Sequence, residues 1–327
     1  MGADRLLDLF TCPVCGATLR AHDGDAARVG CRNGHRFPFG RGYLDLSDGS
    51  PGHGTTARTF ESFGFEWNTF DEVRDEDVQF ARAYFRDLDM ASLAGKTGVD
   101  AGCGKGRYTR FLAPYLDALV ALDGSSAVEA AVRNLEPFGN VLVVKADLRT
   151  VPMVDECADL VVSLGVLHHL DDPRAGFLRL TRLLAPDGRI LVYLYSRPDT
   201  FGVRAAALAA AAVIRKLTVR VPLRLLRVLA VPIAAILWAG VVVPGSVGAR
   251  RHVDALERLP MAAYRAKPFR SLVLDTFDRL SAPVEHRYVW EELAPWFDEA
   301  GLDVEAVREE AGWFVLARRP SGAGSQG

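Results

Sequence analysis

The stretch VDAGCGKGRY, residues 99–108, is the most informative part of this sequence. An apolar run ends in Asp100, and glycine follows at Gly102, Gly104 and Gly106. Glycines at such a turn let backbone amides approach a ligand closely. The dinucleotide fingerprint is G-x-G-x-x-G/A, but the position of its third small residue holds arginine here, and the carboxylate of Asp100 would repel a pyrophosphate. The turn therefore favours a ligand with a cationic group, such as an amino acid.

The segments around this turn alternate between strand and helix patterns. Strands are expected at 97–102, 118–124, 141–147, 158–165 and 188–196, helices at 105–116, 125–135 and 173–185, and a last helix and strand at 290–301 and 312–320. The strands are continuous apolar runs, which is typical of parallel strands covered by helices on both faces. The pattern predicts an α/β fold, a doubly wound Rossmann-like sheet of seven strands with a helical insertion after the fifth.

Acidic residues follow two further strands of this expected sheet. Asp123 ends the second strand, where a carboxylate can accept hydrogen bonds from ribose hydroxyls, and Asp147 ends the third. With the glycine turn, these residues resemble the class I S-adenosylmethionine-dependent methyltransferases. The resemblance implies that the turn, with Asp100, cradles the methionine part of S-adenosyl-L-methionine. It also implies that Asp123 binds the ribose, that Asp147 binds adenine and that Leu148 packs near the adenine ring.

The fourth strand leads into SLGVLHHLDDP, residues 163–173, which resembles the same motif in small-molecule and lipid-quinone methyltransferases. Oxygen and nitrogen acceptors of a methyl group can need a general base. The candidate bases are His168, His169 and His286, each expected at the cofactor crevice; for the first two, support of the loop and packing against the cofactor is the competing interpretation. Upstream, Phe63 and Trp67 are candidates for a lid over the cofactor, and core packing is their alternative.

The N-terminal residues contain two pairs of metal-ligand type. Cys12 and Cys15 form C-x2-C, and Cys31 and His35 form C-x3-H, with fifteen residues between the pairs. Four such ligands suit a tetrahedral, structural Zn²⁺, and metal-free thiols are the alternative. The segment resembles the zinc module of the rRNA guanine methyltransferases, which raises RNA as a substrate. Acidic residues beside its arginines leave no strong basic face, so RNA is the less favoured partner.

An apolar, basic segment interrupts the expected sheet. Residues 200–253 contain no Asp or Glu, and residues 228–248 carry no charge. That length can span a bilayer, but a single span would separate the last strand from its sheet. We expect a helical cap over the substrate pocket, and the second interpretation adds peripheral contact with an anionic membrane through 200–253. An apolar cap argues for an apolar or lipid-like substrate.

Composition places the chain among globular proteins. Hydrophobic residues make up 49% and charged residues 24% of 327 residues, and the net charge of −2 does not point to nucleic acid. The N-terminal residues lack a signal-peptide pattern and the five cysteines do not form a disulfide framework, so we expect a cytoplasmic protein, with membrane association as the alternative. The expected domains are a zinc-binding module (1–48), a linker and helical lid (49–95), the cofactor-binding core (96–199), the insertion (200–270), the last helix and strands (271–319) and a disordered tail (320–327).

These observations predict an S-adenosylmethionine-dependent methyltransferase with a small-molecule or lipid-like acceptor. One alternative is an RNA methyltransferase that recognises RNA through the zinc module. Another is a non-catalytic, membrane-associated binding protein on the same scaffold. The acceptor and the oligomeric state have no sequence signal.

Overall fold

The computed structural model divides into two compact units. One unit comprises Met1–Arg197 and Val284–Gly327, and the other comprises Pro198–Pro283. The structure describes residues 6–22, 25–47, 55–198, 203–253, 261–265 and 267–322. Parts of the expected linker (50–54) and of the expected tail (323–327) lie outside these described residues.

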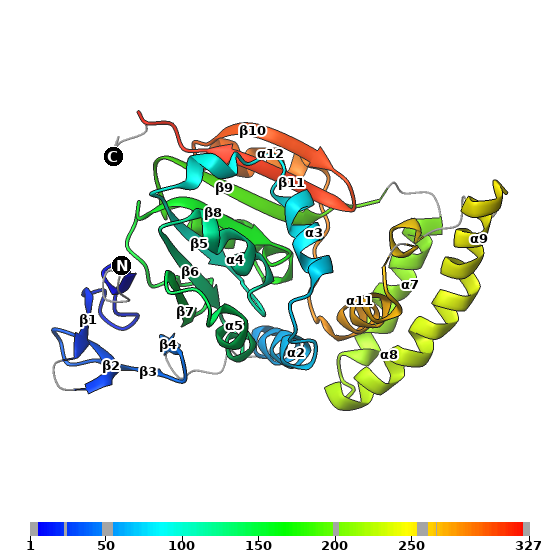
Figure 1. Cartoon of the computed structure of the whole chain (residues 1–327), viewed down its shortest axis with the longest axis horizontal. Helices are drawn as coiled ribbons and strands as arrows, with labels where there is room; N and C mark the ends of the chain where they lie inside the picture. The colour runs from blue at the N-terminus through cyan, green and yellow to red at the C-terminus, as the bar shows by residue number, and fades with distance from the viewer. Residues whose placement is uncertain are drawn as a thin grey trace. The chain divides into compact units, whose positions relative to one another are not determined.

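Five parallel strands form the centre of the sheet (Figure 1). They are β5 (Thr97–Ala101), β6 (Ala118–Asp123), β7 (Val141–Lys145), β8 (Ala158–Leu164) and β9 (Leu184–Tyr195), in the spatial order β7-β6-β5-β8-β9. Each coincides with an apolar run of the sequence, as expected for strands buried on both faces. The chain progresses outward from β5 to β7 and then returns to the other side of β5 at β8. This topological switch point is where sheets of this kind bind ligands, beyond the carboxyl ends of the strands.

The sheet is mixed and longer than predicted. β11 (Gly312–Arg318) pairs antiparallel with β9 and lies between it and β10 (Asp303–Glu309). At the opposite edge, β4 (Tyr43–Asp45) pairs in parallel with β7, and β1 (Leu19–His22), β2 (Asp25–Cys31) and β3 (Arg36–Gly40) continue from it. The described residues thus form an eleven-stranded sheet. Seven of these strands, β7-β6-β5-β8-β9-β11-β10, form one continuous run. The predicted count of seven is not confirmed for the whole sheet, because the N-terminal strands join it through β4.

The N-terminal residues also share the hydrophobic core of the first unit. Phe10, Leu19 and Leu44 are fully buried and belong to the same cluster as Val144 and Phe177. Burial of such side chains stabilises the fold by about 1.5–3 kcal/mol each. The boundary expected after residue 48 therefore does not separate two cores.

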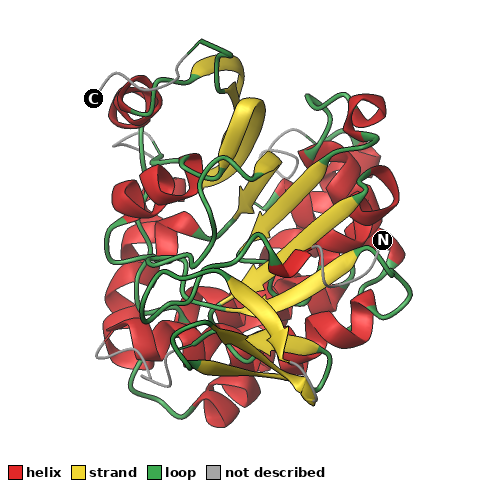
Figure 2. Ribbon diagram, turned by 90° about the vertical axis from the view of Figure 1, so that its left-hand side faces the viewer, coloured by secondary structure: helices red, strands yellow, loops and turns green. Residues whose placement is uncertain are grey.

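Helices cover both faces of the central strands, as Figures 1 and 2 show. One face carries α6 (Pro173–Thr181) and α12 (Trp290–Glu299), whose Phe177 and Phe297 are fully buried. The other face carries α3 (Asp75–Tyr84), α4 (Arg107–Leu112) and α5 (Val128–Leu135). Alternate residues of β6 belong to the two faces, since Val120 and Leu122 pack with α6 and α12 while Leu119 packs with α4.

The second unit is helical. Its elements are α7 (Val203–Thr218), α8 (Leu223–Leu237), a π-helical segment (Trp238–Val242), α9 (Val243–Arg251) and α11 (Phe269–Ser281). The helix Leu223–Arg251 is continuous and, by length and composition, apolar enough to cross a membrane. Thr218 Oγ1 donates to the carbonyl of Leu280 at 2.7 Å, which ties α7 to α11. Because α11 packs against α7 and α8, the unit runs to Pro283, and this differs from the insertion boundary expected at residue 270.

Candidate active site

The turn after β5 requires its glycines. Gly102, Gly104 and Gly106 have φ values of 88°, 53° and 81°, in the left-handed region that favours glycine. The amide of Gly102 donates to the carbonyl of Leu122 at 2.7 Å, which holds the turn against the end of β6. A Cβ atom at Gly102 would lie 2.4 Å from the side chain of Val166, so no larger residue fits there. The backbone of this turn is therefore fixed at the switch point of the sheet.

Asp100 is buried beneath the turn. Its side chain is 1% exposed, and its Oδ2 accepts a hydrogen bond of 2.6 Å from Thr109 Oγ1. Burial raises the pKa of Asp100 to about 6, because the charged form is desolvated. The nearby charge of Asp123 raises the pKa further, whereas Thr109 and Arg107 lower it. A cationic group brought to this site would favour the ionised form of Asp100.

Asp123 joins the ends of β5 and β6. Its Oδ2 accepts from the amide of Gly104 at 3.0 Å, and its Oδ1 accepts from the amide and the hydroxyl of Ser125 at 2.8 and 2.6 Å. A carboxylate has about four acceptor positions, so these three bonds leave capacity on Oδ2. The carboxylate is thus held in one orientation and retains an acceptor position for a ligand.

Asp147 has a partner that the sequence did not reveal. Arg149 donates to Asp147 Oδ2 from Nη2 at 2.5 Å and from Nε at 2.9 Å, and its amide donates to Oδ1 at 2.8 Å. Both side chains are partly exposed, at 22% for Asp147 and 44% for Arg149, so the ion pair contributes little stability. Leu148 is buried in the core cluster that includes Leu46 and Met153. The adenine role expected for Asp147 would require Arg149 to share its carboxylate.

Helix α2 (Thr55–Thr69) covers the strand ends. A Cβ atom at Gly104 would lie 3.0 Å from Trp67 Nε1, and a Cβ atom at Gly124 would lie 2.6 Å from the ring of Phe60. The ring of Phe63 lies 4.8 Å from that of His169. The aromatic side chains predicted as a lid therefore contact the glycine turn and the loop after β8.

Charged side chains of the turn contact helix α2 and the residues that follow it. Lys105 is 3% exposed; its Nζ donates to the carbonyl of Glu72 at 2.5 Å and lies 3.4 Å from Asp77 Oδ2. The guanidinium of Arg107 lies 5.3 Å from the centre of the Trp67 ring, a cation–π distance. Asn134 donates to the carbonyls of Asp71 and Lys105. Sequence analysis missed these contacts, because charged residues in a turn are ordinarily solvated.

The three candidate histidines lie in one cluster. The rings of His168 and His169 are 4.3 Å apart, and the amide of His286 donates to the carbonyl of His168 at 2.9 Å. His169 Nδ1 lies 2.7 Å from the carbonyl of Val284. Because a carbonyl only accepts, Nδ1 carries the proton, and Nε2 is the basic nitrogen of the neutral ring.

His168 is the most unusual member of this cluster. It is fully buried, and among the described residues neither of its ring nitrogens has a hydrogen-bond partner. Burial holds its pKa well below the usual value, and the charges of His169, Arg287 and His286 act in the same direction. Its ring stacks on Tyr195 at 3.9 Å, and the guanidinium of Arg287 lies 4.8 Å from the Tyr195 ring. The imidazole is therefore neutral and has two unused polar atoms beside the crevice.

The four predicted metal ligands converge near the N-terminal strands. Cys15 Sγ lies 3.7 Å from Cys31 Sγ, and His35 Nδ1 lies 3.4 Å from Cys31 Sγ and 3.6 Å from Cys12 Sγ. All four ligand atoms lie within 4.8 Å of one another. Tetrahedral zinc, with Zn–S of about 2.3 Å and Zn–N of about 2.0–2.1 Å, requires S–S and S–N separations of about 3.8 and 3.5 Å. The three separations of 3.4–3.7 Å lie close to these values.

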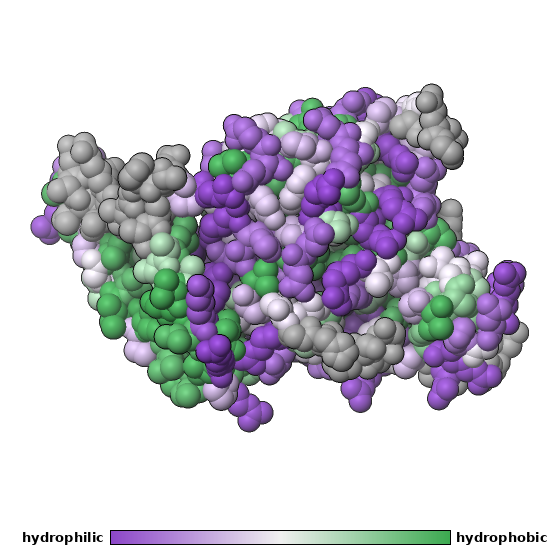
Figure 3. Space-filling view, turned by 180° about the vertical axis from the view of Figure 1, so that it is seen from behind, coloured by the Kyte–Doolittle hydropathy of each residue, from purple (hydrophilic) through white to green (hydrophobic). Residues whose placement is uncertain are grey.

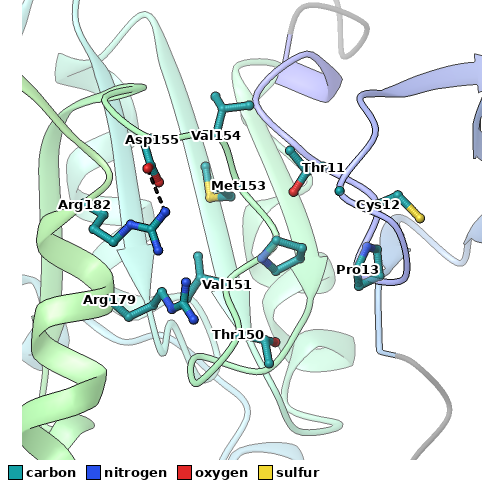
Figure 4. A pocket seen from close by; sticks show the side chains of 12 residues that line it. Thr11, Cys12, Pro13, Thr150, Val151, Met153, Val154, Asp155, Arg179 and Arg182 are labelled. Atoms are coloured by element: carbon teal, nitrogen blue, oxygen red, sulfur yellow. Dashed lines mark hydrogen bonds and ion pairs between the residues drawn. The ribbon is translucent and has the colours of Figure 1, made fainter. Parts of the chain in front are cut away.

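A cavity of about 490 Å³ lies beside these ligands and away from the strand ends. Cys12 and Pro13 line one side and Val151, Arg179 and Arg182 line the other, as Figure 4 shows. Arg182 donates a hydrogen bond of 2.7 Å to Asp155, which lies beside it in the lining of this cavity. None of the residues that line this cavity belongs to the glycine turn or to the histidine cluster.

The sheet order and the glycine turn at its switch point define a Rossmann-like α/β fold. Residues 99–192 match the family described as “Methyltransferase domain”. This segment holds the glycine turn, all three strand-end acids and two of the candidate histidines.

Relatives match this part of the chain. An uncharacterized methyltransferase of Mycobacterium tuberculosis (strain ATCC 25618 / H37Rv) is 28% identical over 110 residues, 34% of this chain and 56% of the relative. A malonyl-[acyl-carrier protein] O-methyltransferase of Methylovorus sp. (strain MP688) is 29% identical over 44% of this chain and 51% of its own. A demethylmenaquinone methyltransferase of Clavibacter sepedonicus is 33% identical over 35% of this chain and 47% of the relative. The chain spans about half the length of these curated relatives.

Solved structures include a similar SAM-dependent methyltransferase from Aquifex aeolicus. The alignment covers 78% of this chain and 97% of the Aquifex protein, with a TM-score of 0.45 and 15% sequence identity.

The raised pKa of Asp100 predicts a specific pH dependence of stability. Between pH 3.8 and about 6 the unfolded carboxyl ionises while the folded one keeps its proton, so the folded state loses stability as the pH rises. The Asp100→Asn variant has no carboxyl at this position and does not lose this stability. Between pH 4 and pH 7, its unfolding free energy should therefore rise relative to that of the wild type by on the order of 2–3 kcal/mol. Urea unfolding of both proteins measures it. A difference that stays constant over this range would contradict the assignment.

Proposed function

We propose that this chain is an S-adenosylmethionine-dependent methyltransferase with a small-molecule or lipid-like acceptor. The observation that carries the proposal is the arrangement at the tips of three neighbouring strands. The glycine turn follows β5, and Asp100, Asp123 and Asp147 lie at the carboxyl ends of β5, β6 and β7. An acid beneath the turn suits an ammonium, and an acid after the second strand suits a ribose.

The residues present fit the cofactor chemically. Asp123 is oriented by Gly104 and Ser125 and keeps an acceptor position for a ribose hydroxyl. The exposed Asp147–Arg149 pair costs little to rearrange for an adenine amino group. Gly102 and Gly106 add no side chain of their own to the turn, although Val166 and Leu135 pack against them. S-Adenosylmethionine, when bound, supplies an electrophilic methyl group.

The chain's own residues would position the acceptor and exclude water. Phe60, Phe63 and Trp67 of α2 already cover the strand ends, which removes solvent from a transfer step. We propose that the acceptor's hydroxyl or amine forms a hydrogen bond with the unpartnered ring nitrogens of His168. His169 and His286 are the other candidate bases. Because the pKa of His168 lies well below its usual value, its imidazole stays neutral and would orient the acceptor by hydrogen bonds from its ring nitrogens.

The acceptor class is supported by the relatives and by the second unit. The names of two relatives specify malonyl-acyl-carrier protein and demethylmenaquinone as what those enzymes methylate. Apolar side chains dominate the helices of residues 203–253, which suits an apolar or lipid-linked acceptor better than RNA. This proposal therefore retains the small-molecule or lipid-like class.

We further propose that Cys12, Cys15, Cys31 and His35 hold a structural Zn²⁺. Support comes from ligand separations that match tetrahedral coordination. Hydrogen bonds from the Ala17 amide and from Asn33 lower the pKa of Cys15 to about 6, which favours the thiolate. A closed four-ligand site has no open position for water, so its role is to order the strands β1–β3. Such thiolates suit a reducing cytoplasm, where we place the protein.

Transfer of label from methyl-labelled S-adenosylmethionine tests the proposed activity. The full chain is incubated with lipid, small-molecule and RNA fractions of an extract. Label is expected in the lipid or small-molecule fraction, and His168→Phe, which keeps a ring against Tyr195 but removes both nitrogens, should lower the rate by about 10²-fold or more. Label in RNA would favour the RNA alternative. No label in any fraction, with cofactor binding intact, would indicate a non-catalytic protein.

Asp123→Ala should weaken binding of S-adenosylhomocysteine by about 10–100-fold, because charge-assisted hydrogen bonds to the ribose are lost. Isothermal titration calorimetry measures the affinity. Asp117→Ala is the matched control, since Asp117 accepts from the Gly95 amide at the opposite end of β5. Equal affinities of wild type and Asp123→Ala would remove the ribose assignment.

Metal analysis of the purified chain should find about one zinc per molecule, and Cys12→Ser should lose most of it. Cys157→Ser, a half-buried cysteine outside the cluster, should retain the metal. Wild-type protein without zinc, prepared in zinc-supplemented medium, would refute the site.

A further inference from the structure

The second unit contains a helix whose small residues face inward and whose bulky apolar residues face outward. The buried positions of the helix Leu223–Arg251 are Leu223, Leu226, Ala230, Ala234, Val242, Gly245 and Gly248. Their spacing is three or four residues, apart from one gap of eight between Ala234 and Val242, so they form one face. Helix α11 packs against α8, which explains why this face is buried. Alanine and glycine at its centre let the helices approach closely.

The opposite face is apolar instead of polar. Val228 is 65% exposed and Ile236 is 72% exposed, although a helix at the surface of a water-soluble protein normally places polar residues there. Most of the exposed large apolar side chains among the described residues belong to this unit: Val213, Ile214, Leu217, Leu225, Val228, Leu229, Val231, Ile233, Ile236, Val243, Val247 and Val253. Figure 3 shows hydrophobic residues gathered over this helical unit. A patch of this size marks an interaction surface.

Basic residues border this apolar face at both ends. Exposed Lys216, Arg220, Arg224 and Arg227 lie around the turn from α7 to α8, and exposed Arg250 and Arg251 end α9. No Asp or Glu occurs between residues 200 and 253. An anionic lipid surface attracts basic groups that stand beside exposed apolar side chains, because the apolar side chains can then enter the lipid.

The topology argues for a helix that lies in the membrane surface. β9 precedes this unit, and β11 follows it and pairs with β9, with Gly312 opposite Tyr195. A single crossing would place these two paired strands on opposite sides of a bilayer. In a surface orientation, both basic ends lie at the headgroups at once, and α11 covers the face that points away from lipid.

We propose that the unit Pro198–Pro283 docks peripherally on an anionic phospholipid membrane through the outward face of the helix Leu223–Arg251. Val228 and Ile236 enter the acyl boundary, and Arg224, Arg227, Arg250 and Arg251 contact lipid phosphates. The proposal does not depend on methyl transfer, because none of the observations behind it concerns cofactor binding.

Co-sedimentation of the full chain with vesicles tests this docking. We expect binding to phosphatidylcholine vesicles with about one third phosphatidylglycerol and about tenfold weaker binding to phosphatidylcholine alone. Arg224→Glu combined with Arg227→Glu should reduce binding to the anionic vesicles by about tenfold or more, and raised salt should act in the same direction. Val228→Asn combined with Ile236→Asn should also reduce it by about tenfold.

The matched control is Val304→Asn combined with Val307→Asn, two valines on β10 that are each 39% exposed. This control should bind like wild type, and unchanged cofactor affinity and melting temperature establish that each variant folds. Failure of wild type to bind anionic vesicles, or equal binding to neutral ones, would overturn the proposal. So would resistance of membrane-bound protein to alkaline carbonate, which indicates a span, or a dimer in solution that Val228→Asn with Ile236→Asn dissociates without any vesicle binding.

Discussion

The hydrogen bond from the Gly104 amide to the Asp123 carboxylate connects the ends of two neighbouring strands at the switch point of the sheet. It forms only because Gly104 and its neighbours adopt left-handed backbone conformations, which brings the amide toward β6. The same conformations leave room for the indole of Trp67 directly above Gly104. The turn therefore determines where the strand-end carboxylate points and also how closely helix α2 can approach. Both properties are what a methyltransferase domain needs around a nucleoside with an amino-acid tail.

Much of the central fold follows from local sequence patterns. The apolar runs that end in Asp100 and Asp123 coincide with β5 and β6, and the helix after Pro173 begins where aspartate and proline predict it. The pairing of β4 with β7 was not predictable, because three residues carry almost no strand signal and their partner lies about a hundred positions along the chain. The extent of the second unit was also missed, since α11 is amphipathic like any core helix and only its packing assigns it to α7 and α8.

In the candidate site, too, local sequence patterns predict some residues and miss others. Residue types and spacing indicated Asp100, Asp123 and the four zinc-ligand candidates, because each belongs to a compact motif. The contacts of Lys105 with Glu72 and Asp77, and of Arg149 with Asp147, join residues that no local pattern singles out. The unpartnered state of His168 depends on tertiary packing by Tyr195 and the loop of His286. Polar contacts of this kind decide which groups stay available to a ligand, and they can be read only from the folded chain.

The proposed function depends on whether the ends of β5, β6 and β7 bind a nucleoside beneath helix α2. A crystal structure of the full chain with S-adenosylhomocysteine measures this most directly. The account predicts ribose hydroxyls within hydrogen-bond distance of Asp123, the amino-acid moiety along the turn Gly102–Gly106, and Trp67 over the ligand. Crystals grown in saturating ligand that show Phe60 and Trp67 still packed against the glycines, with the ligand bound elsewhere or not at all, would contradict it.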